Sequence, residues 1–233
     1  MINANADAMG IIFPNNYDQF VPELVSERLM ASIPFASRYR MIDFLLSSMV
    51  GCGIDKIEVL VRENYHSLVD HLGGGREWDL SRKNGGLSIF PPFAQKTIGS
   101  MGGGRVEALS NILPVLRKQK EKYVIMADTN IAANFDFNAL IEQHVETGAD
   151  ITIAYTKEEL PQELTGAKDA SKGLYYTLKL DGNKVEDIYI NKQEQGVQNF
   201  SMNIYIANRE WLIDTINTAF MRGAIYLERD ILI

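Results

Sequence analysis

Asp128 is the residue whose type and position best suit it for chemistry. It follows residues 123–127 (YVIMA), a continuous apolar run that is typical of a central parallel strand. Open α/β sheets bind ligands beyond the carboxyl ends of their strands. There a carboxylate can hold Mg²⁺ and bridge it to a substrate phosphate. Position alone is equally consistent with Asp128 capping the turn that follows.

Four basic residues are candidates for binding phosphate groups. Arg28, Arg38 and Arg40 follow the first predicted strand, and an arginine can grip a phosphate through two parallel hydrogen bonds. Lys192 follows the second strand of a predicted hairpin, from which it could reach a sugar phosphate. Taken singly, the arginines fit a surface or ion-pair role better than a ligand-binding role.

Several other kinds of site are excluded by composition and spacing. His66 and His71 are five residues apart, and the chain has neither an HExxH nor a CxxC pattern, so no zinc site is predicted. The glycine clusters at 73–75 and 102–104 match neither a Walker A loop nor GxGxxG. The single cysteine, Cys52, leaves no internal disulfide and suits a reducing compartment.

Charge and hydropathy narrow the class of protein further. The net charge of −7 argues against a general nucleic-acid or membrane-surface binder. The N-terminus resembles no signal peptide, and no apolar run approaches membrane-spanning length. We therefore expect a cytoplasmic protein that binds neither nucleic acid nor membrane.

The elements that must position these residues alternate along the first two thirds of the chain. Strands are predicted at 9–13, 56–61, 123–127 and 150–156, and helices at 41–49, 65–72, 105–120 and 137–147. Residues 73–100 and 158–172 are expected to be loops without packed elements. The alternation predicts an α/β fold with a doubly wound, mostly parallel (mixed) sheet.

The last third of the chain has a different pattern. Asp-Gly-Asn at 181–183 lies between alternating runs at 174–180 and 184–190, which predicts a hairpin. A strand at 200–207 and a helix at 210–220 follow. Because the chain stops inside an apparent element, we expect a single domain, 1–233, that is cut short at its C-terminal end.

Ordered motifs along the chain resemble the bacterial ADP-glucose pyrophosphorylase (glucose-1-phosphate adenylyltransferase) family. Residues 34–44 (PFASRYRMIDF) match that family's P-F-G-G-K-Y-R-x-I-D-F block, and His66, Ser67, Leu68 and His71 match its S-H-S-L-x-x-H block. The resemblance implies a Rossmann-like nucleotidyltransferase domain, normally followed by a left-handed β-helix domain that this chain lacks. It also implies ATP and glucose 1-phosphate as substrates.

The resemblance assigns roles to the candidate residues. The family's metal-binding aspartate maps onto Asp128, which implies Mg²⁺ as the cofactor if the site is functional. The glucose 1-phosphate segment E-K-P falls at residues 191–193 and gives Lys192 the sugar phosphate. Arg40 and Arg28 are the expected further substrate contacts. In the strand that follows, Asn203 stands where the family has glycine.

Departures from the family pattern point to a degenerate site. The glycine-rich nucleotide loop G-G-x-G-x-R-L is replaced by FPNNYDQFV, and no glycine lies between Phe13 and Val50. Met30 replaces a lysine, G-T-A-D-A becomes Gly-Arg-Val-Glu-Ala at 104–108, and D-F-G-x-D becomes Tyr-Leu-Glu-Arg-Asp at 226–230. Asp128 is then expected to be vestigial, because each lost contact to a transition state costs roughly a hundredfold in rate.

The pattern therefore resembles the GlgD-type subunit, a regulatory or weakly catalytic partner of the catalytic GlgC-type subunit in glycogen biosynthesis. Whether the chain is itself an enzyme is left open at this point. The alternative is a working glucose-1-phosphate adenylyltransferase with an unusual nucleotide loop. A dehydrogenase of Rossmann type is disfavoured because GxGxxG does not follow the first strand.

Overall fold

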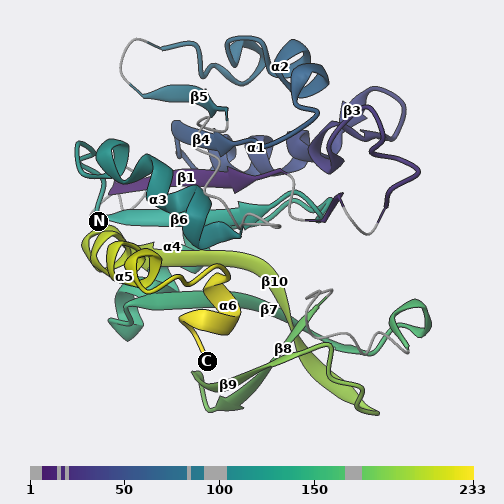
Figure 1. Ribbon diagram of the computed structural model, residues 1–233, viewed down its shortest axis with the longest axis vertical. Coiled ribbons are helices and arrows are strands. Elements are labelled where there is room, and N and C mark those ends of the chain that lie inside the picture. The colour runs from purple at the N-terminus through teal and green to yellow at the C-terminus, as the bar shows by residue number, and fades with distance from the viewer. Residues whose placement is uncertain (1–6, 15–16, 19–20, 83–84, 92–103, 166–174) are drawn as a thin grey trace.

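A mixed β-sheet runs through the whole molecule (Figure 1). The computed structural model describes residues 7–14, 17–18, 21–82, 85–91, 104–165 and 175–233. Among these residues the sheet has eight strands in the order β5-β4-β1-β6-β10-β8-β9, and β7 also pairs with β10. The strands are β1 (Ala8–Phe13), β4 (Lys56–Leu60), β5 (Gly86–Phe90), β6 (Tyr123–Asp128), β7 (Ile151–Glu159), β8 (Tyr176–Asp181), β9 (Lys184–Ile190) and β10 (Val197–Asn208).

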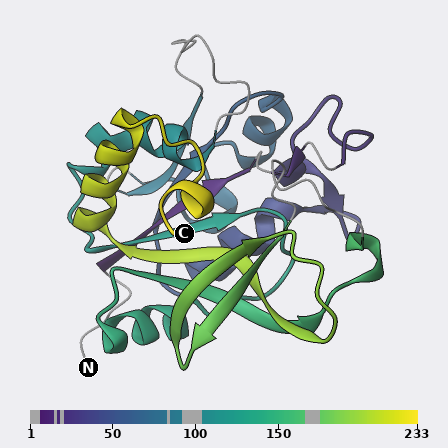
Figure 2. The ribbon, with the colours of Figure 1, turned by 60° about the horizontal axis from the view of Figure 1, so that its bottom comes forward.

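The N-terminal half of the sheet is parallel and the C-terminal half is antiparallel. Strand β1 pairs in parallel with β4 and β6, and β4 pairs in parallel with β5. Strand β10 runs antiparallel to β6, β7 and β8, and β8 and β9 form the predicted hairpin around Gly182. The hairpin projects from the sheet in Figure 2. The predicted doubly wound, mixed sheet is confirmed.

Helices cover both faces of the sheet. The parallel strands carry buried apolar side chains on both faces, so each face needs a layer of helices over it. In β1, Ala8 and Ile12 face one core, and Met9, Ile11 and Phe13 face the other. Helices α1, α2 and α4 contribute to the first core, and α3, α5 and α6 to the second. The helices are α1 (Met41–Gly51), α2 (His66–Leu72), α3 (Arg105–Leu116), α4 (Phe137–Thr147), α5 (Arg209–Met221) and α6 (Leu227–Asp230).

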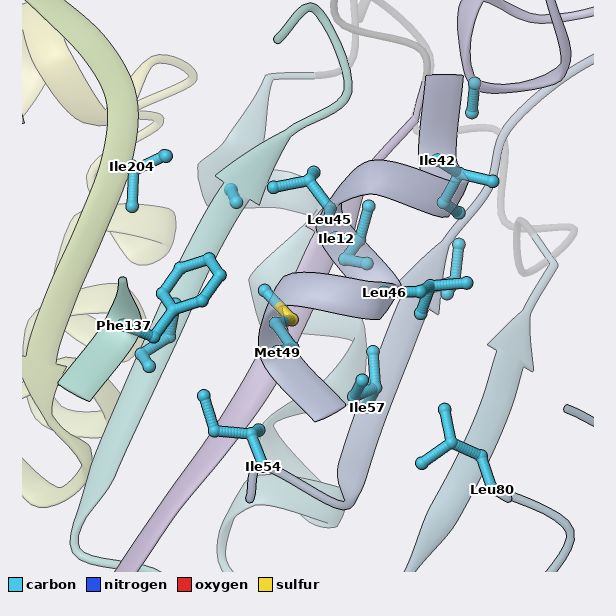
Figure 3. Packing of buried hydrophobic residues seen from close by; sticks show 14 of the residues in the cluster. Ile12, Ile42, Leu45, Leu46, Met49, Ile54, Ile57, Leu80, Phe137 and Ile204 are labelled. Carbon is cyan, nitrogen blue, oxygen red and sulfur yellow. The ribbon is translucent and has the colours of Figure 1, made fainter. Parts of the chain in front are cut away.

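Helix α1 lies closely against β1 (Figure 3). Its side chains Leu45, Leu46 and Met49 are almost completely buried. A Cβ atom at Gly10 of β1 would come within 2.7 Å of the Met49 sulfur, so the glycine sets how near the helix can pack. The apolar spacing that predicted this helix is the spacing that buries its inner face.

Two predictions about loops need correction. Residues 73–100 were expected to hold no packed element, yet 86–90 form β5, which extends the parallel sheet beside β4. The strand is short and opens on glycine, so its pattern resembled a loop. The loop predicted at 158–172 begins later, because β7 continues to Glu159. Residues 83–84, 92–103 and 166–174, which cover parts of these two segments, lie outside the described residues.

Smaller elements complete the described chain. Strands β2 (Pro34–Phe35) and β3 (Tyr39–Arg40) form a separate two-stranded sheet, and 3₁₀ turns lie at Met30–Ser32, Arg76–Trp78 and Gln162–Leu164. Helix α3 was predicted to reach residue 120 but ends at Leu116, two residues after Pro114. Within the described residues, no helix is long and apolar enough to span a membrane.

Candidate functional site

Asp128 ends the central strand β6, as the sequence predicted. It lies in register with Phe13, the last residue of β1, and its side chain is fully buried. Strand β6 lies between β1 and β10 in the sheet. The carboxylate therefore stands at the carboxyl end of two parallel strands, which is where α/β sheets of this kind bind ligands.

The Asp128 carboxylate is bound by a buried arginine. Nη2 of Arg105 contacts Asp128 Oδ2, and Nη1 of the same guanidinium contacts Oε1 of Glu228. All three side chains are at most 6% exposed. Burial, the largest single influence, would lower the pKa of Arg105, but the charge of Asp128 and the nearby tyrosines together outweigh it and raise the pKa above its usual value. One positive charge thus holds two carboxylates in the core.

Helix α3 and the segment before α6 bring Arg105 and Glu228 together. Arg105 is the first residue of α3, and its neighbour Val106 donates a backbone hydrogen bond of 3.2 Å to the carbonyl of Ile225. This close approach depends on Gly104, because a Cβ there would lie 2.0 Å from the same carbonyl oxygen. The backbone contact places the start of α3 beside Glu228 in α6.

Aromatic rings surround the guanidinium. The Cζ atom of Arg105 lies 5.5 Å from the ring centroid of Phe13 and 5.3 Å from that of Tyr205, within the range of cation–π attraction. The hydroxyl of Tyr205 donates a hydrogen bond of 2.9 Å to Glu228 Oε1. Burial raises the pKa of Tyr205 to about 12, so this hydroxyl keeps its proton at neutral pH.

The loop after β1 turns a side chain into the same cluster. Tyr17 is buried, and its hydroxyl accepts a hydrogen bond of 2.6 Å from Asn203 Nδ2. Burial, and then the charge of Asp128, raises the pKa of Tyr17. Asn203 itself has φ +53°, a left-handed conformation that asparagine tolerates better than most residues. Glycine adopts this conformation readily, which fits the glycine found at this position in the family motif that residues 200–206 resemble.

The donor set does not suit a divalent cation. Mg²⁺ needs several oxygen ligands in octahedral geometry, and here Arg105 engages the carboxylates of both Asp128 and Glu228. Among the described residues, no group of three or more His, Cys, Asp or Glu side chains could hold a metal ion. The expected assignment of Mg²⁺ to Asp128 therefore finds no support in the geometry of this cluster.

The other predicted site residues have partners of their own. Arg40 donates from Nη1 to the carbonyl and the hydroxyl of Ser67, both at 2.7 Å, and so holds the start of α2. Lys192 lies 2.7 Å from Glu194 and 4.1 Å from the ring centroid of Tyr189. The hydrogen bond that Lys192 donates to Glu194 raises the pKa of Lys192. Their assignment to substrate binding stays a prediction.

Arg28 and Arg38 lie on the outer part of the described structure. Arg28 is partly exposed, and Arg38 is exposed with its guanidinium stacked 5.2 Å from the ring centroid of Tyr39. The substrate-binding role predicted for Arg28 stays a prediction as well.

The segment around Lys192 is held in place by Tyr175, whose hydroxyl donates to the Lys192 carbonyl at 3.0 Å.

Sequence reasoning missed Arg105, Glu228 and Tyr17 as members of the cluster. A signal was present for the first of these. An arginine at the first position of a helix is unfavourable beside the positive end of the helix dipole, so it needs a buried carboxylate or another compensating partner. Tyr17 and Glu228 carried no such signal, because their burial depends on segments far apart in the chain.

Three comparisons place the chain among known proteins. A family model described as nucleotidyl transferase matches residues 23–167. A Bacillus anthracis crystal structure, described as a glucose-1-phosphate thymidylyltransferase in complex with sucrose, superposes with a TM-score of 0.66 at 13% identity. The match covers 94% of this chain and 85% of that one. At this identity the likeness shows the fold alone.

Curated relatives carry two names. "Glycogen biosynthesis protein GlgD" of Geobacillus stearothermophilus is 36% identical over 64% of this chain and 43% of its own length, and that of Bacillus subtilis is 30% identical over 83% and 56%. "Glucose-1-phosphate adenylyltransferase" of Thermomicrobium roseum is 31% identical over 90% and 47%. The chain spans about half the length of these relatives. The resemblance found in the sequence is confirmed, and the chain belongs to the nucleotidyl transferase family.

Proposed function

We propose that this chain is the nucleotidyltransferase-like domain of a regulatory or weakly catalytic subunit of ADP-glucose pyrophosphorylase. That enzyme makes ADP-glucose and pyrophosphate from ATP and glucose 1-phosphate for glycogen biosynthesis. Relatives named for glycogen biosynthesis and for glucose-1-phosphate adenylyltransferase support the pathway. The subunit would work in the cytoplasm, in a hetero-oligomer with a catalytic GlgC-type subunit.

One observation carries the regulatory assignment. The carboxylate at the carboxyl end of the central strand is bound by Arg105 inside the core, and Tyr17 from the replaced nucleotide loop is buried in the same cluster. The charge of this carboxylate is already offset by Arg105. It therefore cannot bind a metal ion for adenylyl transfer unless the core rearranges. The nucleotidyltransferase fold is retained, but side chains of the protein itself occupy the space at the carboxyl end of the central strand.

The second candidate is an active adenylyltransferase with an unusual nucleotide loop. It is favoured by the relatives of that name, such as the one from Clostridium novyi at 33% identity over 82% of this chain. It is also favoured by Lys192, whose charged end lies at the surface beside Glu194. For this candidate to hold, Arg105 must leave Asp128 when substrates bind.

The decisive experiment measures pyrophosphate release with Mg²⁺, ATP and glucose 1-phosphate by the complete protein, alone and co-expressed with a GlgC-type subunit. Alone, we expect a rate at least about a hundredfold below that of the catalytic subunit, because several phosphate contacts are missing. In the mixed assembly, we expect altered substrate affinity or effector response. Comparable turnover by the protein alone, lost on Asp128→Asn, would establish the second candidate instead.

Separate calorimetric titrations refine the assignment. ATP with Mg²⁺ and glucose 1-phosphate are each titrated into the 233-residue chain. Binding of the sugar phosphate without ATP would agree with a filled nucleotide site and a retained sugar site around Lys192. Tight binding of both ligands would favour the active enzyme. As a matched control, Lys192→Met should weaken binding of glucose 1-phosphate and leave binding of ATP unchanged.

A further inference from the structure

We infer that Arg105 is the site's own permanent cation, which takes the place of a divalent ion between Asp128 and Glu228, and that removing its guanidinium opens a cation site there. The inference concerns this buried cluster alone. It holds whether or not the chain acts in glycogen biosynthesis.

The geometry of the guanidinium makes the two carboxylates converge. Its terminal nitrogens are bound to a single carbon atom, and one contacts Asp128 while the other contacts Glu228. The guanidinium is planar and rigid, so the two contacted carboxylate oxygens lie around one small group. With the guanidinium removed, the same two anionic oxygens would be ligands of the kind that a hard cation accepts.

Neutral oxygen ligands lie around the same volume. The hydroxyl of Tyr205 is 2.9 Å from Glu228 Oε1 and 3.3 Å from Asn203 Oδ1. Hard cations such as Mg²⁺ and Mn²⁺ accept carboxylate, amide and hydroxyl oxygens together with water. Without the guanidinium, the cluster would offer two carboxylates with an amide and a phenol beside them.

Charge explains why a cation must be present. Asp128 is fully buried and Glu228 is 2% exposed, and two buried carboxylates close together repel each other. Removing one partner from a buried ion pair leaves an uncompensated charge and is strongly destabilising. Arg105 meets this need at every pH and at every ion concentration, because a guanidinium does not lose its proton in proteins. The native chain should therefore be indifferent to divalent ions at this position.

The test uses Mn²⁺ as the probe, because its electron paramagnetic resonance signal reports bound ion directly. Thermal unfolding in Mn²⁺ and in EDTA supplies a second measurement. The native chain, Arg105→Ala, and the double variant Arg105→Ala with Glu228→Gln are compared. Arg82→Ala is the matched control, since Arg82 is exposed and pairs with Asp55 and Asp79 at the surface.

We expect Mn²⁺ to leave the native chain and Arg82→Ala unchanged. Arg105→Ala should bind one Mn²⁺ and unfold at a higher temperature in Mn²⁺ than in EDTA. At a Mn²⁺ concentration about 100-fold above Kd, the rise should be roughly 5–10 °C for a chain of this size. The double variant, which lacks the Glu228 carboxylate, should lose most of the binding.

Three outcomes would overturn the inference. The first is Mn²⁺ binding by the native chain that Asp128→Asn abolishes, because the site would then be open already. The second is a folded Arg105→Ala that binds no Mn²⁺. If Arg105→Ala does not fold in EDTA, refolding in Mn²⁺ decides the matter. Recovery of the native circular dichroism spectrum supports the inference, and failure in both buffers is the third contrary outcome.

Discussion

Gly104→Ala should destabilise the fold, although it adds only one methyl group. Gly104 directly precedes α3, and its added Cβ would lie 2.0 Å from the carbonyl oxygen of Ile225 and 2.7 Å from the carbonyl carbon. Ordinary contacts between heavy atoms are roughly 3.5–4.0 Å. Both contacts are with backbone, so no side-chain rotation can relieve them, and α3 must move away from the segment before α6.

The magnitude follows from what this movement costs. Overpacking typically costs about 1–3 kcal/mol, and loss of the hydrogen bond from Val106 to Ile225 costs about 0.5–1.5 kcal/mol more. Alanine restricts the unfolded chain, which returns about 0.4–1 kcal/mol. The net loss should be about 2 kcal/mol, or a fall in Tm of roughly 4–8 °C for a chain of this length.

Urea unfolding followed by circular dichroism measures the effect, with Gly51→Ala as the control. Gly51 is the last residue of α1, and nothing lies within 4 Å of an added Cβ there. Alanine should therefore stabilise that position by about 0.5–1 kcal/mol. If Gly104→Ala is as stable as the native chain, or if both variants lose the same amount, the close approach of α3 to Ile225 is not what the structure indicates.

Three further predictions concern other parts of the fold. Ser37 is exposed at φ +77°, so Ser37→Gly should raise the free energy of unfolding by about 1 kcal/mol in urea titrations, and a loss would contradict the strain. Burial lowers the pKa of His144 from 6.5, so its neutral form contributes stability above pH 6.5 that is lost as the pH falls through the lowered pKa. Between pH 7.5 and 5.5, His144→Gln should therefore lose less Tm than the native chain, and equal losses would refute this. Asp43 Oδ1 lies 2.6 Å from His71 Nε2, so a double-mutant cycle of their alanine variants should give a coupling of about 0.5–3 kcal/mol, whereas additive effects would mean that the pair is unimportant.

Helix α4 shows how much local sequence can specify. It was predicted at residues 137–147 and is observed there. Asp136 caps its start, with Oδ1 accepting hydrogen bonds from the backbone of Asn138 and Ala139, and Gly148 ends it at φ +61°. Start signal, apolar spacing and stop signal are all local, so they can be read without the fold.

Strand β5 shows where local information runs out. Its five residues resemble a loop because they open on glycine and precede a proline. They become a strand because the edge of β4 offers hydrogen-bonding partners in register from Lys56–Gly86 to Leu60–Phe90. A short segment is determined by its neighbour in the sheet more than by its own propensity.

The sequence by itself determined the alternating strands and helices, the mixed sheet and the position of Asp128 at the end of the central strand. Those features follow from periodicity and from the buried run of β6, which are properties of neighbouring residues. Only the tertiary structure decided the state of Asp128. Its partner Arg105, the Glu228 carboxylate that Arg105 also binds, and its neighbour Tyr17 come from α3, α6 and the loop after β1, and they meet only when the sheet forms. A residue's position is thus a local matter, whereas its charge environment depends on every segment that folds around it.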